Sequence, residues 1–157
     1  MSYVEKNLMS GESVIETAKL HWFIFVPGVS LLAVGVWLFG LVTSTGDTTI
    51  GPIFGTIAVS LAIISLIKAY ILKISTELAV TSKRIIAKVG LIRRNTVELN
   101  HAKVESFNID QSIFGRIFGF GTLIVNGTGG GKTPIPSIAA PLDFRRSAME
   151  TIDSSQG

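Results

Sequence analysis

The stretch GTGGGKT, residues 127–133, has the residue types of a phosphate-binding loop. In a Walker A loop, Gly-x-x-x-x-Gly-Lys-Ser/Thr, backbone N–H groups surround the phosphates and the lysine reaches their oxygens. Counting back from the Gly-Lys-Thr end, the first glycine position holds Asn126. Pro134 and Pro136 would also break the helix that must follow such a loop. We therefore predict a glycine-rich hairpin turn, in which glycines allow positive φ, and no nucleotide site.

Other residues with catalytic chemistry are few and scattered. Cysteine is absent, which excludes disulfides, thiolate metal sites and cysteine nucleophiles. The two histidines, His21 and His101, have neither metal-ligand spacing nor a paired carboxylate, and no serine lies in a Gly-x-Ser-x-Gly elbow. We predict that the protein is not an enzyme and holds no metal or cofactor.

Basic residues are better candidates for binding. A cluster lies within residues 83–94 and consists of Lys83, Arg84, Lys88, Arg93 and Arg94. Cytoplasmic leaflets are anionic, and each Lys or Arg held near one contributes about 1 kcal/mol. The cluster is therefore a candidate surface for lipid headgroups, with an ordinary solvated face as the alternative. The net charge of +3 is small for nucleic-acid binding, which usually also brings base-stacking aromatics.

The apolar residues of the chain are concentrated in two long runs. Mean hydropathy is +0.52 and only 16% of residues are charged. Apart from Asp47, residues 22–67 carry no charge. Each run approaches the ~20 apolar residues that cross a hydrocarbon core of about 30 Å as helix. We predict a transmembrane hairpin over residues 22–72, with helices at 22–42 and 50–72.

Two other interpretations of these runs are weaker. Core helices of a soluble protein seldom stay free of charge for so long, because one face normally meets water. A cleaved signal peptide begins with a short basic region, whereas residues 1–21 mix acids with bases.

Lysine and arginine predict the orientation of the hairpin. The link TSTGDTTI has no basic residue, whereas seven basic residues follow from Lys68 to Arg94, with Glu77 as the only acid among them. Under the positive-inside rule we expect both termini in the cytoplasm, and we expect a multi-pass protein of the plasma (inner) membrane. Lys68 lies about one turn inside the second span and can extend its ammonium group to the surface.

Small residues recur at helical spacing in the second span, at Gly51, Gly55, Ala58 and Ala62. Gly51 and Gly55 form a GxxxG pattern, which allows close approach of two helices. The pattern could serve the hairpin itself or an oligomer. We take Gly51, Gly55 and Ala62 as candidates for an oligomer interface.

Residues 75–157 have a different pattern, typical of an antiparallel sheet followed by a helix. Short runs with a period of two, such as TELAV, RIIAKV, NTVEL and GTLIV, are separated by turn signals. After Pro141, the apolar residues Phe144, Ala148 and Ile152 fall on one face of a terminal helix. The segment ESVIETAKL, within residues 1–21, alternates in part and is a candidate for one further strand.

The run from TSKRII at residues 81–86 to GTGG at 127–130, with KVES and QSIFGRIFGFGT between them, resembles the bacterial pleckstrin-homology-like (bPH2) membrane proteins of the YdbS-like group. The closing PIPSIAAPLDFRR and the preceding apolar hairpin fit the same pattern. The resemblance implies a PH-like fold, a bent antiparallel β-barrel capped by the C-terminal helix. The expected fold class is therefore an α+β membrane protein, and no established enzymatic activity is implied.

The segment SIFGRIFGF, residues 112–120, is unusually apolar for a short connection. We expect Phe114 and Phe118, four residues apart, to cover the barrel core, with Arg116 on the solvent side. If they do not, they would form a patch for another subunit or partner.

These observations lead to one expectation and one alternative for function. We expect a non-enzymatic membrane-anchored module for assembly, protein interaction or lipid interaction, present as a homo-oligomer. Its partners would be membrane lipids, further copies of the chain and other membrane proteins, without nucleic acid or nucleotide. The alternative is a channel or transporter component in which oligomerised hairpins enclose a path faced by Lys68.

Overall fold

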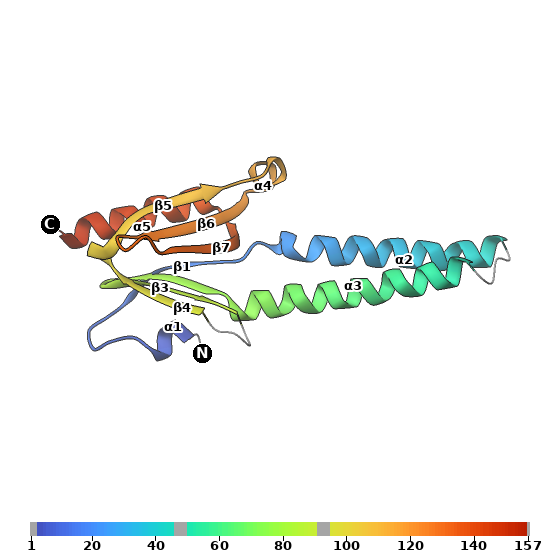
Figure 1. Ribbon diagram of the computed structural model, residues 1–157, viewed down its shortest axis with the longest axis horizontal. Coiled ribbons are helices and arrows are strands. Elements are labelled where there is room, and N and C mark those ends of the chain that lie inside the picture. Colours follow the sequence, from blue (N-terminus) through green and yellow to red (C-terminus); the bar gives the residue numbers. More distant parts are fainter. Residues whose placement is uncertain (1–2, 46–49, 91–94, 157) are drawn as a thin grey trace. The chain divides into compact units, whose positions relative to one another are not determined.

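The computed structural model describes residues 3–45, 50–90 and 95–156 (Figure 1). The chain divides into two compact units. The smaller is Trp22–Lys73, and the larger combines Met1–His21 with Ile74–Gly157. The chain therefore leaves the larger unit after a first strand and returns to it after two long helices.

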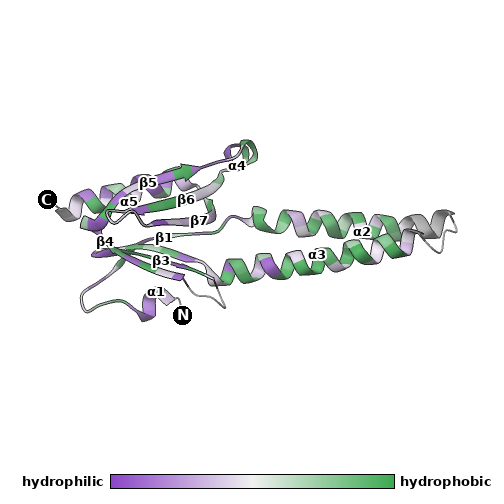
Figure 2. Ribbon diagram, in the orientation of Figure 1, coloured by the Kyte–Doolittle hydropathy of each residue, from purple (hydrophilic) through white to green (hydrophobic). Residues whose placement is uncertain are grey.

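The smaller unit is a helical hairpin. It begins with a short 3-10 helix, η1 (Trp22–Phe25), and continues with α2 (Val26–Thr45) and α3 (Ile50–Ser75). Both helices are long and apolar enough to cross a membrane, with a mean hydropathy of 2.1 over Trp22–Gly40 and over Gly51–Ser75. Figure 2 shows hydrophobic residues along almost their whole described length. The predicted helices are thus confirmed, each about one turn longer at its C-terminal end.

Small residues let α2 and α3 approach closely. A Cβ added to Gly28 would lie 2.7 Å from the Leu66 side chain, and one added to Gly35 would lie 2.7 Å from the Val59 side chain. Gly35 comes after Gly28 in α2, but its partner Val59 comes before Leu66 in α3. The two helices are therefore antiparallel. Three buried small residues of α3, Gly55, Ala62 and Ala69, are spaced seven positions apart. A seven-residue repeat keeps one face of a helix against its neighbour.

The larger unit contains two antiparallel sheets. The first has the strand order β1-β2-β3-β4. Its strands are β1 (Val14–Ala18), β2 (Glu77–Thr81), β3 (Arg84–Val89) and β4 (Asn95–Asn100). β1 lies within the ESVIETAKL segment, in which we predicted an added strand, and it pairs with β2. The hairpin is therefore inserted between two neighbouring strands of one sheet.

Both faces of the first sheet are covered at its centre. Leu78 and Ile85 point to the main core, while Ala79 and Ile86 pack in a second cluster with Val4 of the short helix α1 (Tyr3–Lys6). Neighbouring residues of a strand face opposite sides of the sheet. Coverage of both faces explains why these strands contain consecutive apolar residues rather than a clean alternation.

The second sheet has the strand order β5-β6-β7. Its strands are β5 (Val104–Asp110), β6 (Phe120–Gly127) and β7 (Lys132–Ala139), with the helix α4 (Ile113–Phe118) between β5 and β6. The predicted glycine-rich hairpin is confirmed, because the Gly127 N–H donates to the Gly131 carbonyl at 3.0 Å and Gly130 has φ +76°. Pro134 and Pro136 lie in β7, at the edge of this sheet, where prolines are tolerated.

The two sheets are joined along one edge. Leu20 forms an isolated bridge with Ile138, the Ala139 N–H donates to the Lys19 carbonyl at 2.8 Å, and the His21 N–H donates to the Ser137 carbonyl at 2.7 Å. Where we predicted one bent barrel, the structure has two sheets connected by the residues that follow β1.

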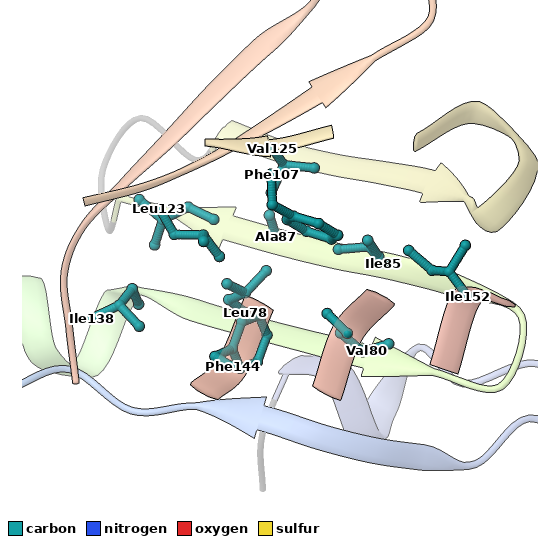
Figure 3. Close-up of a cluster of buried hydrophobic side chains, with 12 residues drawn as sticks. Leu78, Val80, Ile85, Ala87, Phe107, Leu123, Val125, Ile138, Phe144 and Ile152 are labelled. Atoms are coloured by element: carbon teal, nitrogen blue, oxygen red, sulfur yellow. The ribbon is translucent and has the colours of Figure 1, made fainter. Parts of the chain in front are cut away.

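The core lies between the sheets and beneath the helix α5 (Pro141–Gln156). Figure 3 shows Leu78 and Ile85 of the first sheet near Phe107 and Leu123 of the second. The helix contributes Phe144, Ala148 and Ile152, all buried, as their four-residue spacing predicts. One apolar cluster thus connects both sheets and the terminal helix (Figure 3).

Candidate interaction surface

Arg84, one of the predicted headgroup-binding residues, is buried. Its Nε and Nη2 donate to the two carboxylate oxygens of Glu12 at 3.0 Å each, and its Nη1 donates to Glu98 at 2.6 Å. Nη2 also donates to the Asn7 carbonyl at 2.7 Å. The side chain of Arg84 is 7% exposed. Such a forked arrangement satisfies a guanidinium within the protein, so Arg84 is corrected from a candidate lipid ligand to a structural residue.

Glu12 is the other centre of this network. Besides Arg84, the Thr81 hydroxyl donates to it at 2.6 Å and the Met9 N–H donates at 2.7 Å. Burial by itself would raise the pKa of Glu12, but the hydrogen bonds from Met9, Thr81 and Arg84 and the charge of Arg84 together lower the pKa. The carboxylate is therefore held in its charged form inside the domain.

Lys88 is also engaged within the domain. Its Nζ lies 3.6 Å from Glu77 Oε1 and 4.7 Å from the centre of the Tyr3 ring. The carboxylate and the aromatic ring hold the ammonium group of Lys88, so this group is less available to bind a lipid headgroup.

Lys83 is the exposed member of the described part of the basic cluster. Its Nζ donates to the Ser10 carbonyl at 3.0 Å. Arg93 and Arg94 lie outside the described residues. The described members, Lys83, Arg84 and Lys88, therefore do not form one exposed basic patch.

Among the described residues of the larger unit, the short helix α4 carries four exposed large apolar side chains. The exposed fractions are 77% for Ile113, 63% for Phe114, 69% for Ile117 and 45% for Phe118. The expectation that Phe114 and Phe118 cover the core is therefore wrong, since that space is filled by both sheets and α5. The alternative, an exposed apolar patch, holds. We name these four residues the α4 patch.

Local hydrogen bonds form α4 and direct its side chains outward. Ser112 caps the helix by accepting the Gly115 N–H at 3.1 Å, and Gly119 ends it with φ +76°. Gly115 is buried, and a Cβ added to it would lie 2.5 Å from the Phe120 carbonyl oxygen. Gln111 Nε2 donates to the same oxygen at 3.0 Å. Gly115 therefore lies on the side of α4 that packs against the domain, whereas the four large apolar side chains of the helix are exposed.

The base of α4 lies beside the residue from which the chain enters the hairpin. The Phe120 ring stacks on His21, with 5.3 Å between ring centres, and the Ala140 N–H donates to the Gly119 carbonyl at 2.8 Å. His21 is followed directly by Trp22, the first residue of η1. The sequence showed the apolar character of α4 but not this position, because Phe120 and His21 are far apart in the chain.

The remaining candidate residues are placed as follows. Gly55 and Ala62 are buried within the helical hairpin, whereas Gly51 is half-buried. Arg116 is exposed on α4. The two helices thus use Gly55 and Ala62 for their own contact.

A cavity of about 590 Å³ lies between β4 and the glycine-rich turn. Its lining is Asn95, Val97, Leu99, Lys103, Gly127, Thr128, Gly129, Gly131, Lys132 and Thr133. The turn is part of a strand-to-strand hairpin and does not begin a helix, so it lacks the helix dipole that holds phosphates in a P-loop.

Within residues 3–45, 50–90 and 95–156, no group of three or more His, Asp or Glu is arranged to hold a metal ion.

Comparison with known proteins identifies the family of the chain. No curated protein and no solved structure shows a significant match. The sequence profile of the bacterial PH domain family, in contrast, matches residues 22–150. This match covers most of the chain, and the two sheets with a terminal helix agree with the PH-like fold that the motifs implied. The chain therefore belongs to the bacterial PH domain family.

Proposed function

We propose that this protein is a non-catalytic interaction module whose helical hairpin anchors a PH-like domain to the inner membrane. One observation carries the proposal: the two apolar helices are hardly buried. In each of the apolar stretches within Trp22–Gly40 and Gly51–Ser75, only 11% is buried. A core helix of a soluble protein would be mostly buried, and so much exposed apolar surface is unfavourable in water.

The proposed topology places both termini in the cytoplasm. It is supported by the distribution of lysine and arginine, since the link between the helices has none and the residues after α3 have several. The order of an apolar hairpin before the TSKRII and GTGG motifs also supports membership of the YdbS-like group within the family.

The proposed role of the domain is assembly or interaction at the membrane, with lipids or with other membrane proteins. PH-like folds act as interaction modules, and the α4 patch is an exposed apolar surface of the kind that such modules use. Self-association is part of the proposal. Because Gly55 and Ala62 are used inside the hairpin, further copies would contact the outer apolar faces of α2 and α3.

Membrane extraction tests the anchor. Cells that express the full chain are lysed, and the membranes are washed with alkaline carbonate and then with detergent. We expect the protein to stay with the membranes in carbonate and to be released by detergent. Release by carbonate alone would contradict a membrane-spanning hairpin.

Labelling tests the topology. The chain has no cysteine, so Thr48→Cys and Glu150→Cys each introduce one reactive thiol. A membrane-impermeant maleimide should label Thr48→Cys in intact spheroplasts and Glu150→Cys only after lysis. The reverse pattern would place the domain outside the cytoplasm.

Cross-linking and size-exclusion chromatography with light scattering in detergent test self-association. We expect a species larger than one chain with its detergent. A monomer at every protein concentration would contradict the homo-oligomer and would leave the anchor unaffected.

A further inference from the structure

We propose that α4 is a second membrane contact: the α4 patch enters the boundary between headgroups and acyl chains of the cytoplasmic leaflet, beside the point where the first span begins. This inference rests on the proposed membrane anchor. It assigns to the domain a defined orientation on the lipid surface, which a flexible connection to the spans would not impose.

The shape of α4 suits an interfacial position. At 100° per residue, the four residues of the α4 patch occupy an arc of about 140° on the helix. Gly115 lies outside this arc and faces the domain, and Arg116 lies outside it on the other side. One side of the helix is therefore apolar and exposed, while a cation is placed at its margin. Amphipathic helices that lie in the membrane interface combine an apolar face with basic residues on the polar face.

The position of α4 in the domain favours the lipid surface as its occupant. Phe120, directly after Gly119, stacks on His21, and the next residue in the chain is Trp22 of η1. The C-terminal end of α4 is therefore held next to His21, the last residue of the domain before the first apolar helix. Trp22 is 59% exposed, and tryptophan is enriched at membrane interfaces.

The membrane anchor lowers the affinity for lipid that α4 itself must have. A free peptide of this size would bind a membrane weakly, since a short apolar contact must offset the loss of translational freedom. Here the spans would already hold the domain at the surface, so insertion of α4 is an intramolecular step at high effective concentration. The four exposed apolar side chains therefore need to contribute less free energy than a free peptide would.

Charge supports the same occupant. Residues 111–120 contain no acid, Arg116 is exposed, and the nearest acid in the sequence is Asp110 at the end of β5. An anionic leaflet attracts an exposed arginine near its surface. Arg116 can lie among the phosphates while the α4 patch lies below them.

Fluorescence quenching in proteoliposomes tests the proposal on the full chain. Single cysteines are introduced at Ile113 and at Ile117, both highly exposed, and are labelled with an environment-sensitive nitrobenzoxadiazole dye. The vesicles contain phosphatidylethanolamine and phosphatidylglycerol, with spin-labelled lipids that carry the nitroxide near the headgroup or near the acyl-chain end. Ile63→Cys on α3 reports the anchor, and Glu150→Cys on α5 is the reference for water.

The expected result has three parts. Dyes at Ile113→Cys and Ile117→Cys emit at shorter wavelength than the dye at Glu150→Cys, and the shallow nitroxide quenches them more than the deep one. The dye at Ile63→Cys is quenched more by the deep nitroxide. Replacing Phe114 and Phe118 by serine in the Ile117→Cys chain should reduce its quenching towards the level of Glu150→Cys.

Other outcomes would overturn the proposal in distinguishable ways. If the dye at Ile63→Cys is quenched while both α4 dyes behave like Glu150→Cys, the anchor stands and the α4 contact does not. If the emission of the α4 dyes shifts to shorter wavelength without quenching by the nitroxide lipids, and the shift grows with the amount of protein per vesicle, a second copy of the chain covers the α4 patch instead. If the dye at Ile63→Cys is not quenched either, the membrane anchor itself fails.

Discussion

At the scale of single residues, Arg84 and Glu12 form the most connected polar site of the described chain. Arg84 comes from β3 and Glu12 from the segment before β1, and Thr81 and Glu98 bind to the same pair. The network attaches the N-terminal segment to the first sheet. A buried ion pair can be neutral for stability as a whole, but removal of one partner leaves an uncompensated charge.

We predict that Arg84→Ala strongly destabilises the domain. The carboxylate of Glu12 would remain buried without its main partner, which costs about 3–5 kcal/mol. The melting temperature of the detergent-solubilised full chain should fall well below that of wild type. Lys83→Ala is the matched control, because Lys83 is exposed and a surface change is expected to stay within about 0.5 kcal/mol. Equal effects of the two substitutions would contradict the role of the network.

Acid should destabilise the domain partly through Glu12. Its pKa is lowered in the folded state from a usual value of 4.5. The unfolded chain therefore binds a proton more readily, so the contribution of Glu12 is fully present above about pH 4.5 and is lost as the pH falls through the folded pKa. Thermal unfolding followed from pH 7 downward should show this loss. Glu12→Gln should be less stable at pH 7 and should depend less on pH below about 4.5 than wild type does.

At the scale of elements, glycine positions decide which helices can approach. Gly35 of α2 faces α3 so closely that an added Cβ would lie 3.2 Å from the Val59 nitrogen and 3.3 Å from the Gly55 carbonyl oxygen. Both are backbone atoms and cannot move away without shifting α3. A Cβ added to Gly40, on the same helix, would have no neighbouring atom within 4 Å.

We predict opposite effects for alanine at these two glycines. Gly35→Ala should destabilise the hairpin by about 1–3 kcal/mol, since overpacking forces the helices apart. Gly40→Ala should be neutral or slightly stabilising, because alanine is the better helix former by about 1 kcal/mol. Thermal unfolding of both variants in the same detergent compares them. A destabilising effect of similar size in both would argue against close contact at Gly35.

At the scale of the whole molecule, one core connects both sheets and the terminal helix, and Ala18 and Leu20 from before the hairpin pack against it. Phe144 of α5 shares its cluster with Leu78 of the first sheet and Leu123 of the second. The larger unit should therefore unfold as one cooperative body, in which neither sheet survives the loss of the other.

Phe144→Ala tests this cooperativity. Removal of a buried phenylalanine side chain costs about 3–5 kcal/mol, so amide hydrogen exchange should become faster in both sheets together. Leu142→Ala is the control on the same helix, because Leu142 is 56% exposed. Faster exchange in only one sheet would show that the two sheets unfold separately.

The features of this protein that depend on a local pattern could be predicted from the sequence. Length and continuous apolarity predicted both long helices, because a helix without a charged face needs no knowledge of its neighbours. Asn126, Pro134 and Pro136 argued against a Walker A loop and predicted the hairpin that the structure has. The spacing of the apolar residues after Pro141 likewise predicted the buried face of α5.

Whether each candidate residue is buried or exposed became clear only from the fold. Arg84 belongs to a strand whose alternation could not reveal its contacts with Glu12, since these residues are separated by the whole hairpin. The exposure of Phe114 and Phe118 depended on Gly115 packing against Phe120 and on a core already filled by other strands. Burial and pairing are set by distant segments of the chain. The change from a basic cluster to the apolar α4 patch as the candidate surface therefore required the fold.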